Sequence, residues 1–198
     1  MSNEQQVELK IDELINSIFR RGEKISKKEL NYDLGCGNIH QKDYKGIDIL
    51  ESVNPDLVYD LEKYPWTFAK SGSVDHLACS HYLEHTRDFY KFFDECYRIL
   101  KPNGRIFIIA PYYTSCKAIQ DNNHQRLLCE QSFVYLSKEA RKSNGLNYVN
   151  CECDFLIEKI DYSLNADFRG KPQDAVMYAI KHFMNVVDDM MIVLRKPK

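Results

Sequence analysis

The segment "YDLGCGNIHQKDYKGID" (residues 32–48) holds the residue types with the clearest chemical potential. Gly35 and Gly37 flank Cys36 directly after an apolar run, and Asp48 closes the next apolar run eleven positions after Gly37. Glycine has no Cβ and tolerates positive φ, so the backbone of such a turn can approach a ligand closely. A carboxylate at the end of the following strand can accept hydrogen bonds from ribose hydroxyls. The segment therefore predicts a turn that binds a nucleoside.

Two common kinds of phosphate-binding motif are excluded, because residues that they require are absent from this segment. The dinucleotide fingerprint needs a third glycine where this chain has His40, and its acid comes about 20 residues later. The Gly-Lys-Ser/Thr end of a phosphate-binding loop does not occur. The pattern thus favours a nucleoside-type ligand without pyrophosphate. Cys36 is expected to pack between the glycines rather than to perform redox chemistry.

Three histidines are candidates for a general base, because histidine ordinarily titrates near neutral pH. His81 ranks first, since it follows an apolar run that predicts a strand over residues 74–80; a lining role without proton transfer stays equally open. His85 is expected to orient the start of the next helix, whereas His124 lies in a later loop. No convincing set of carboxylate and amide ligands occurs at strand ends, so no metal is expected.

The elements that would position these residues alternate between strand and helix. Residues 7–19 have helical spacing of apolar side chains and are followed by Gly22. Short strands are predicted within residues 29–35, 44–50, 56–61, 74–80 and 104–113. A helix is predicted over residues 86–100, with Thr86 or Asp88 as its N-terminal cap, and the turn at residues 101–104 ends it. This alternation predicts parallel βαβ units with helices on both faces of the sheet.

The last third has a different pattern. It predicts one long strand over residues 147–164, a helix over 174–190 and a closing strand over 191–196. On the long strand, Cys151 and Cys153 would point to one face and pack there.

Composition limits the class of protein. The chain has 198 residues, 44% hydrophobic and 28% charged, with a net charge of −2, which predicts one globular domain and makes nucleic acid an improbable partner. Seven cysteines without a CxxC pair argue against a disulfide framework and a structural zinc site. The start of the chain lacks a signal-peptide pattern and no apolar run is long enough for a bilayer, so we expect a cytoplasmic protein without a membrane partner.

Four motifs in order resemble the class I S-adenosylmethionine-dependent methyltransferases: "NYDLGCGN", "GIDI", "DLVYDLEKYPWTFAKSGSVDHLACSHYLEH" and "FYKFFDECYRILKPNGRIFIIAPYY". The closest group is "type 11", which includes quinone-biosynthesis-like enzymes. The resemblance covers residues 30–113, most specifically 74–111, and continues more loosely to the end. It implies an α/β Rossmann-like fold: a mostly parallel seven-stranded sheet with an antiparallel last strand and helices on both faces. It also implies one domain over 1–198, divided into an N-terminal helix and loop (1–29), a cofactor half (30–113) and an acceptor half (114–198).

The resemblance assigns residues to a bound S-adenosylmethionine. Asp33 and the glycines would surround its methionine part, Asp48 its ribose, Asp60 and Leu61 its adenine, and Ser80 and His81 its sulfonium and methyl. The full set of implied cofactor residues is Asp33, Gly35, Cys36, Gly37, Asp48, Ile49, Asp60, Leu61, Ser80 and His81. The implied acceptor pocket holds Tyr82, Tyr112, Tyr113, His124 and Arg126, with His81 and His124 as catalytic candidates.

One departure from the family pattern concerns the turn. Most members have a full helix between the glycines and the ribose acid, whereas only "NIHQKDYK" follows Gly37 here. This places the chain in a compact subset, with Glu51 as the fallback for Asp48. The implied function is methyl transfer to a small-molecule or metabolite-linked acceptor. The alternatives are a non-catalytic cofactor-binding subunit and a protein or RNA methyltransferase.

Overall fold

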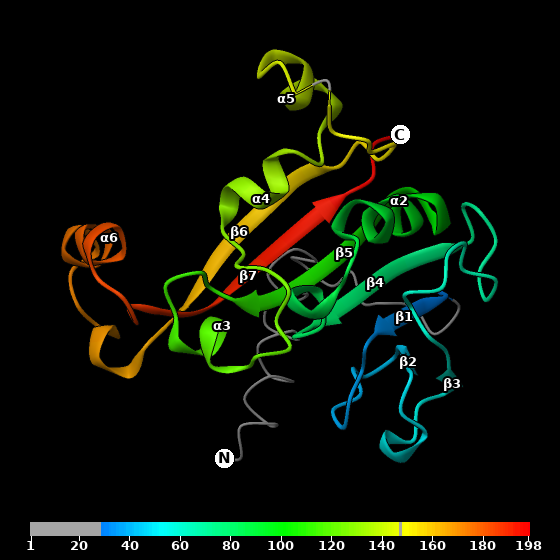
Figure 1. The fold of residues 1–198 in the computed structure, drawn as a ribbon, viewed down its shortest axis with the longest axis horizontal. Helices are drawn as coiled ribbons and strands as arrows, with labels where there is room; N and C mark the ends of the chain where they lie inside the picture. The colour runs from blue at the N-terminus through cyan, green and yellow to red at the C-terminus, as the bar shows by residue number, and fades with distance from the viewer. Residues whose placement is uncertain (1–28, 147) are drawn as a thin grey trace.

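The fold is described from a computed structural model, which covers residues 29–146 and 148–198. Seven strands form one sheet in the order β3-β2-β1-β4-β5-β7-β6 (Figure 1). Strands β1 to β5 pair in parallel, while β7 is antiparallel to both of its neighbours. The predicted sheet is confirmed. The strands are β1 (Asn31–Leu34), β2 (Lys45–Asp48), β3 (Leu57–Val58), β4 (Val74–Ser80), β5 (Leu100–Pro111), β6 (Leu156–Leu164) and β7 (Val187–Arg195).

The helices among the described residues are short. They are α2 (Phe89–Ile99), α3 (Cys116–Gln120), α4 (Glu130–Val134), α5 (Lys138–Ser143) and α6 (Gln173–His182), with 3-10 turns η1 (Glu51–Val53), η2 (Leu83–His85) and η3 (Ala166–Phe168). None of them is long and apolar enough to cross a bilayer. The helix predicted over residues 7–19 lies outside the described residues.

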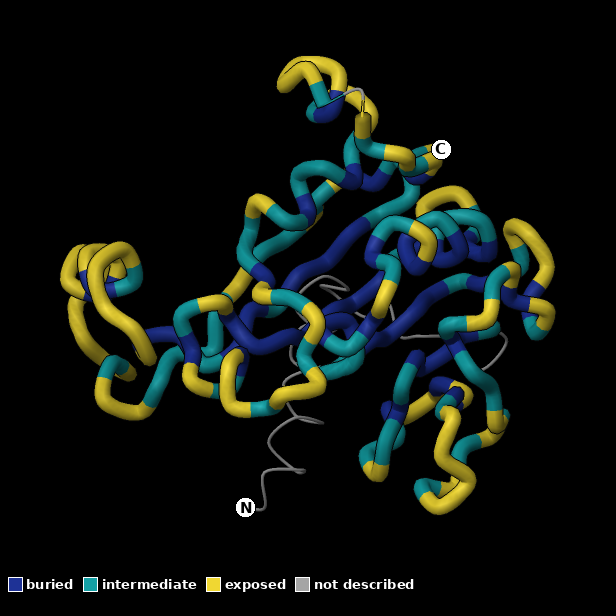
Figure 2. Tube along the Cα trace, in the orientation of Figure 1, coloured by how far each residue is buried: buried dark blue, intermediate teal, exposed yellow. Residues whose placement is uncertain are grey.

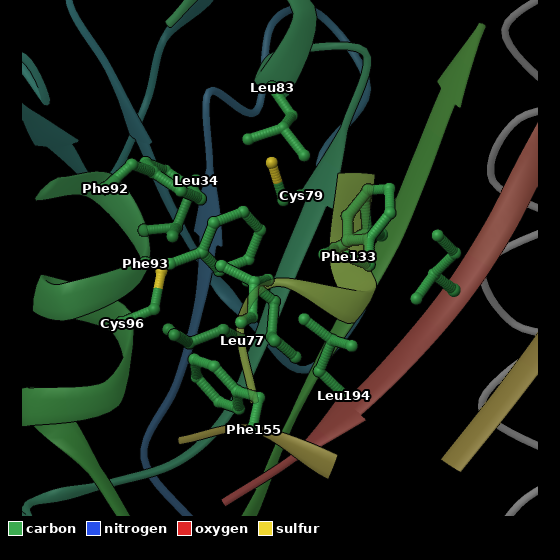
Figure 3. Close-up of a cluster of buried hydrophobic side chains, with 14 of the residues drawn as sticks. Leu34, Leu77, Cys79, Leu83, Phe92, Phe93, Cys96, Phe133, Phe155 and Leu194 are labelled. Atoms are coloured by element: carbon green, nitrogen blue, oxygen red, sulfur yellow. The ribbon is translucent and has the colours of Figure 1, made fainter. Parts of the chain in front are cut away.

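The central strands are buried on both faces, as the apolar run in β5 predicts. Because side chains alternate along a strand, Leu77 and Cys79 face one cluster, whereas Ala78 and Phe107 face another. Figure 2 shows β4, β5 and β7 as the continuous buried centre of the molecule. The larger cluster lies between the sheet and α2 (Figure 3).

Helix α2 covers that cluster because its apolar side chains share one face. Buried residues recur at spacings of three and four along it: Phe89, Phe92, Phe93, Cys96 and Ile99. Of the two predicted caps, Asp88 is the one used, since its carboxylate accepts the Lys91 N–H at 3.0 Å. Thr86 instead donates its hydroxyl to the Leu83 carbonyl.

Two predictions about the last third are wrong. Strand β6 begins at Leu156, and residues 151–155 form no strand, because the Asp94 carboxylate accepts the Glu152 and Cys153 N–H groups that a ladder would use. Helix α6 ends at His182, not at residue 190, and β7 begins at Val187. Asn185 between them has φ 60°, a left-handed conformation that ends the helical path.

Candidate functional site

The glycine turn after β1 has two glycines in the left-handed region, with φ +69° at Gly35 and +56° at Gly37. A Cβ on Gly35 would lie 2.5 Å from Cγ of Tyr82, so this position has no room for a side chain. A Cβ on Gly37 would meet no heavy atom within 4 Å. Gly35 is therefore required by packing, while Gly37 borders open space that a ligand can fill.

No helix connects the turn to β2, as the short spacing predicts. Side-chain carboxylates hold this connection instead. Asp33 accepts the Gln41 N–H at 3.0 Å, and the two oxygens of Asp48 accept the N–H groups of Gly37 at 3.0 Å and Leu50 at 2.9 Å. Burial raises the pKa of Asp33 to about 6, and the hydrogen bond from Gln41 opposes that rise.

A cleft of about 580 Å³ opens at the carboxyl ends of β1, β2 and β4, where ligands bind in sheets of this type. Ile49 and Leu50 leave 59% and 57% of their surface exposed, so apolar side chains border the cleft without a partner in the described structure. The lining consists of Gly35, Gly37, Asp48, Ile49, Leu50, Tyr59, Asp60, Leu61, Glu62, His81, Tyr82, His85 and Arg87.

Most of the implied cofactor residues meet in this cleft. Three do not line it: Asp33, Cys36 and Ser80. Asp33 is buried behind the turn, and Cys36 packs against Gly46, where a Cβ would lie 2.8 Å from the Cys36 Sγ. Burial, together with the charges of Asp33 and Asp48, raises the pKa of the Cys36 thiol to about 12. The thiol is therefore protonated near neutral pH, which favours a packing role.

Four lining residues were missed by sequence reasoning: Leu50, Tyr59, Glu62 and Arg87. Leu50 directly follows Ile49, so the sequence held a signal for it. Glu62 and Arg87 carried no signal, because they come from segments 25 residues apart that the fold joins. The Glu62 carboxylate accepts the Arg87 N–H at 3.2 Å. His85, a candidate general base that was expected mainly to orient the start of the next helix, also lines the cleft.

His81 directly follows β4 and has φ 52°, a conformation uncommon outside glycine and often found at functional sites. Its side chain is 32% exposed. Nδ1 lies 3.4 Å from a Glu84 oxygen and Nε2 lies 3.9 Å from an Asp189 oxygen, while Lys117 pairs with Asp189 at 3.1 Å. Two buried carboxylates thus flank an imidazole that also lines the cleft.

The residues assigned to the acceptor pocket are not all brought together. Tyr82 lines the cleft, but the buried Tyr112 donates its hydroxyl to Glu130 at 3.1 Å, and the half-exposed Tyr113 packs edge-on against Tyr112. Neither of these two tyrosines lines the cleft.

His124 and Arg126 line a second hollow, of about 450 Å³, formed by the loop after α3. The Arg126 guanidinium donates to the main-chain carbonyls of Thr86 and Arg87, which fastens this loop to the segment before α2. The His124 ring packs edge-on against the His85 ring, with 4.7 Å between centroids. The second hollow is therefore joined to the cleft through this pair of histidines.

Comparison with known proteins identifies the fold and gives a family match over part of the chain. Residues 32–108 match the family described as "Methyltransferase domain". No curated protein matches the chain. The structure is similar to a SAM-dependent methyltransferase from Archaeoglobus fulgidus (TM-score 0.62, 18% identity, 98% of this chain and 95% of that one). It is also similar to a putative methyltransferase from Bacillus halodurans (TM-score 0.59, 14% identity, 98% and 100%).

A third similar structure is geranyl diphosphate C-methyltransferase from Streptomyces coelicolor, solved with Mg²⁺, geranyl-S-thiolodiphosphate and S-adenosyl-L-homocysteine (TM-score 0.58, 12% identity, 95% of this chain and 75% of that one). At such low identity these likenesses establish the fold alone. Residues 32–108 thus match a methyltransferase domain, and the described structure has the fold of these S-adenosylmethionine-dependent methyltransferases.

Proposed function

We propose that the cleft binds S-adenosylmethionine through the glycine turn and that the chain methylates a small-molecule or metabolite-linked acceptor. The observation that carries the proposal is the lining of the cleft: open space beside Gly37, the Asp48 carboxylate, and the exposed apolar side chains of Ile49 and Leu50. These features fit a nucleoside with free hydroxyls and no phosphate. S-adenosylmethionine supplies a methyl group on a positively charged sulfur.

Charge favours a small acceptor over a nucleic acid. Three carboxylates line the cleft, from Asp48, Asp60 and Glu62, against one permanent cation, Arg87. A phosphate backbone would be repelled by such a surface. His81 lies between the cleft and the carboxylates of Glu84 and Asp189, so it is the group best placed to remove a proton from an acceptor.

Calorimetry with S-adenosylhomocysteine tests the cofactor site. We expect Asp48→Ala to lose charge-assisted hydrogen bonds worth roughly 1.5–3 kcal/mol each, which weakens binding by about tenfold or more. Glu51→Ala is the matched control, because Glu51 is exposed and does not line the cleft. Because Asp48 also holds the turn, Asp48→Asn, which keeps one acceptor oxygen, separates lost ligand contacts from a disturbed backbone. Equal binding by the wild type and Asp48→Ala would contradict the assignment.

Turnover tests the acceptor class. The purified chain is mixed with S-adenosylmethionine and panels of hydroxyl, amine and thiol metabolites, and the release of S-adenosylhomocysteine is measured. Tight binding without turnover on any panel would favour a non-catalytic partner subunit instead. Nucleic acid that co-purifies at low salt and is lost at high salt would favour a macromolecular acceptor.

A further inference from the structure

A carboxylate and two imidazoles converge beside the cleft, on its acceptor side. Glu84 and His85 belong to η2, directly after β4, while His124 comes from the loop after α3. One potential ligand atom from each residue lies within 4.8 Å of the other two. No metal site was expected from the sequence, because no convincing set of carboxylate and amide ligands occurs at strand ends. Glu84 and His124 are forty positions apart, and only the fold brings them together. The cluster therefore has to be judged from its surroundings.

The Glu84 side chain is the first sign that a cation belongs here. It is only 3% exposed, yet Oε2 has no hydrogen-bond partner among the described residues. The other oxygen, Oε1, lies 3.4 Å from Nδ1 of His81. A buried carboxylate oxygen without a donor loses its hydration and gains nothing in return. A cation bound by Glu84 would supply the missing interaction.

His124 is prepared for metal binding by its own hydrogen bond. Its Nδ1 lies 2.9 Å from the Ala118 carbonyl oxygen, which can only accept, so the ring proton is assigned to Nδ1. The lone pair then remains on Nε2, and the side chain is only 10% exposed. Metal-binding histidines usually donate their other ring N–H to a carbonyl or carboxylate, which fixes the tautomer and the ring orientation.

We propose that Glu84, His85 and His124 form a binding site for a divalent transition metal of the zinc type. Two imidazoles and one carboxylate suit Zn²⁺, Fe²⁺ or Mn²⁺, whereas Mg²⁺ and Ca²⁺ prefer oxygen ligands throughout. Three protein ligands leave a coordination position free, as in catalytic zinc sites. His85 also lines the cleft, so the proposed site adjoins the volume in which an acceptor would bind.

The consequence for chemistry rests on the proposed methyl transfer, although metal binding itself does not. A hydroxyl bound to a divalent metal loses its proton more readily, because the metal stabilises the oxyanion. The site therefore favours acceptors with a hydroxyl group, such as a phenol or an enol, over amines. His81 stands beside Glu84 to receive the released proton.

A second cluster, Asp94 with Cys151 and Cys153, is the competing metal site in the described part of the chain. Three donors already bind Oδ1 of Asp94: the Cys151 thiol and the N–H groups of Glu152 and Cys153. The Arg141 guanidinium donates to the carbonyls of both cysteines and places a fixed positive charge there. This cluster is less suited to a cation, but thiolates bind zinc well, so the experiment must separate the two.

The test uses the full-length chain after treatment with a chelator, titrated calorimetrically with Zn²⁺. We expect Glu84→Gln and His124→Ala each to weaken binding by at least tenfold, since loss of supporting partners alone costs about 10–100-fold. His182→Ala, at an exposed histidine on α6, and the double variant Cys151→Ser/Cys153→Ser should bind as the wild type does. Co²⁺ bound to the wild type should show no thiolate charge-transfer absorption.

Unchanged Zn²⁺ binding in both Glu84→Gln and His124→Ala would overturn the proposal, as would loss of binding in the cysteine double variant. His124 lies in a loop, so His124→Ala tests the site even where Glu84→Gln folds poorly. Binding of S-adenosylhomocysteine is measured on the same samples. If it persists while Zn²⁺ fails to bind, the metal site is refuted and the proposed cofactor cleft stands; the reverse result refutes only the cleft.

Discussion

The contact between Gly35 and Tyr82 gives a prediction whose size can be worked from the structure. An added Cβ at Gly35 would lie 2.5–2.7 Å from three Tyr82 atoms, Cβ, Cγ and Cδ2. These atoms are close to the backbone and cannot swing aside as the end of a flexible side chain can. The left-handed φ of +69° costs a residue with a Cβ roughly 1–2 kcal/mol, and overpacking costs roughly 1–3 kcal/mol. We therefore expect Gly35→Ala to lower the free energy of unfolding by about 2–5 kcal/mol.

Gly37→Ala is the matched control, because this glycine also has positive φ but has no heavy atom within 4 Å of the added Cβ. Its free energy of unfolding should fall only by the cost of the left-handed φ, roughly 1–2 kcal/mol. Urea unfolding of both variants measures the difference. The double variant Gly35→Ala/Tyr82→Ala should recover the part of the steric cost that comes from Cγ and Cδ2 of Tyr82, since alanine keeps Cβ. This recovery appears as a coupling energy of about 1 kcal/mol in a double-mutant cycle.

Two outcomes would refute this reasoning. If Gly35→Ala and Gly37→Ala are equally destabilising, packing against Tyr82 does not restrict the turn. If the coupling between positions 35 and 82 is zero, the clash is relieved by a backbone shift, and the cost belongs to φ alone. Binding of S-adenosylhomocysteine should fall in parallel in Gly35→Ala, since a displaced Tyr82 ring changes the lining of the cleft.

Further predictions concern buried charges. Burial, and to a smaller extent the charge of Arg105, lowers the pKa of His76 from 6.5 to about 4. The unfolded chain therefore binds this proton at a higher pH than the folded chain does, and roughly 3 kcal/mol of stability is lost as pH falls from 6.5 to 4. Urea unfolding of His76→Gln over this pH range should not show that loss. The raised pKa of Asp33 has the opposite effect, because the folded chain holds this proton more tightly than the unfolded chain does. Stability should fall by roughly 3 kcal/mol as pH rises from 3.8 to about 6, and Asp33→Asn should remove this dependence on pH. Glu95 accepts the Trp66 N–H at 2.5 Å and pairs with Arg98 at 2.7 Å. Glu95→Ala should therefore lower the free energy of unfolding by roughly 2–3 kcal/mol, as measured by thermal or urea unfolding. Lys63→Ala removes only an exposed ion pair and should lower it by less than about 0.5 kcal/mol.

The fold could be predicted where local patterns and burial agree. The apolar run in β5 and the spacing of aromatic residues in α2 specify those elements, and the Gly35–Asp48 spacing predicts a connection without a helix. The grouping of Gly35, Gly37, Asp48 and Asp60 in one cleft follows for the same reason, because these residues follow or end neighbouring strands whose ends meet at one edge of the sheet.

The other parts of the fold and of the site depend on contacts between residues far apart in the sequence, which local patterns do not predict. Residues 151–155 alternate as a strand would, but the Asp94 carboxylate, far away in the sequence, accepts their N–H groups. Tyr112 follows a strand that leads toward the cleft, yet its hydroxyl donates a hydrogen bond to the Glu130 carboxylate. The grouping of Glu84 and His85 with His124 likewise depends on how the loop after α3 folds back, which Arg126 fixes by bonds to main-chain carbonyls.

The double role of Asp48 has a consequence for the rate at which a ligand binds. Both of its oxygens already hold main-chain N–H groups on either side of β2, so the carboxylate is fixed before any ligand arrives. The entropy of orienting it is lost during folding rather than during association. A long flexible connection would have to become ordered around the ligand, whereas this short one is preorganised. Association with S-adenosylmethionine should therefore follow a single exponential whose rate rises linearly with ligand concentration, without a slower ordering step.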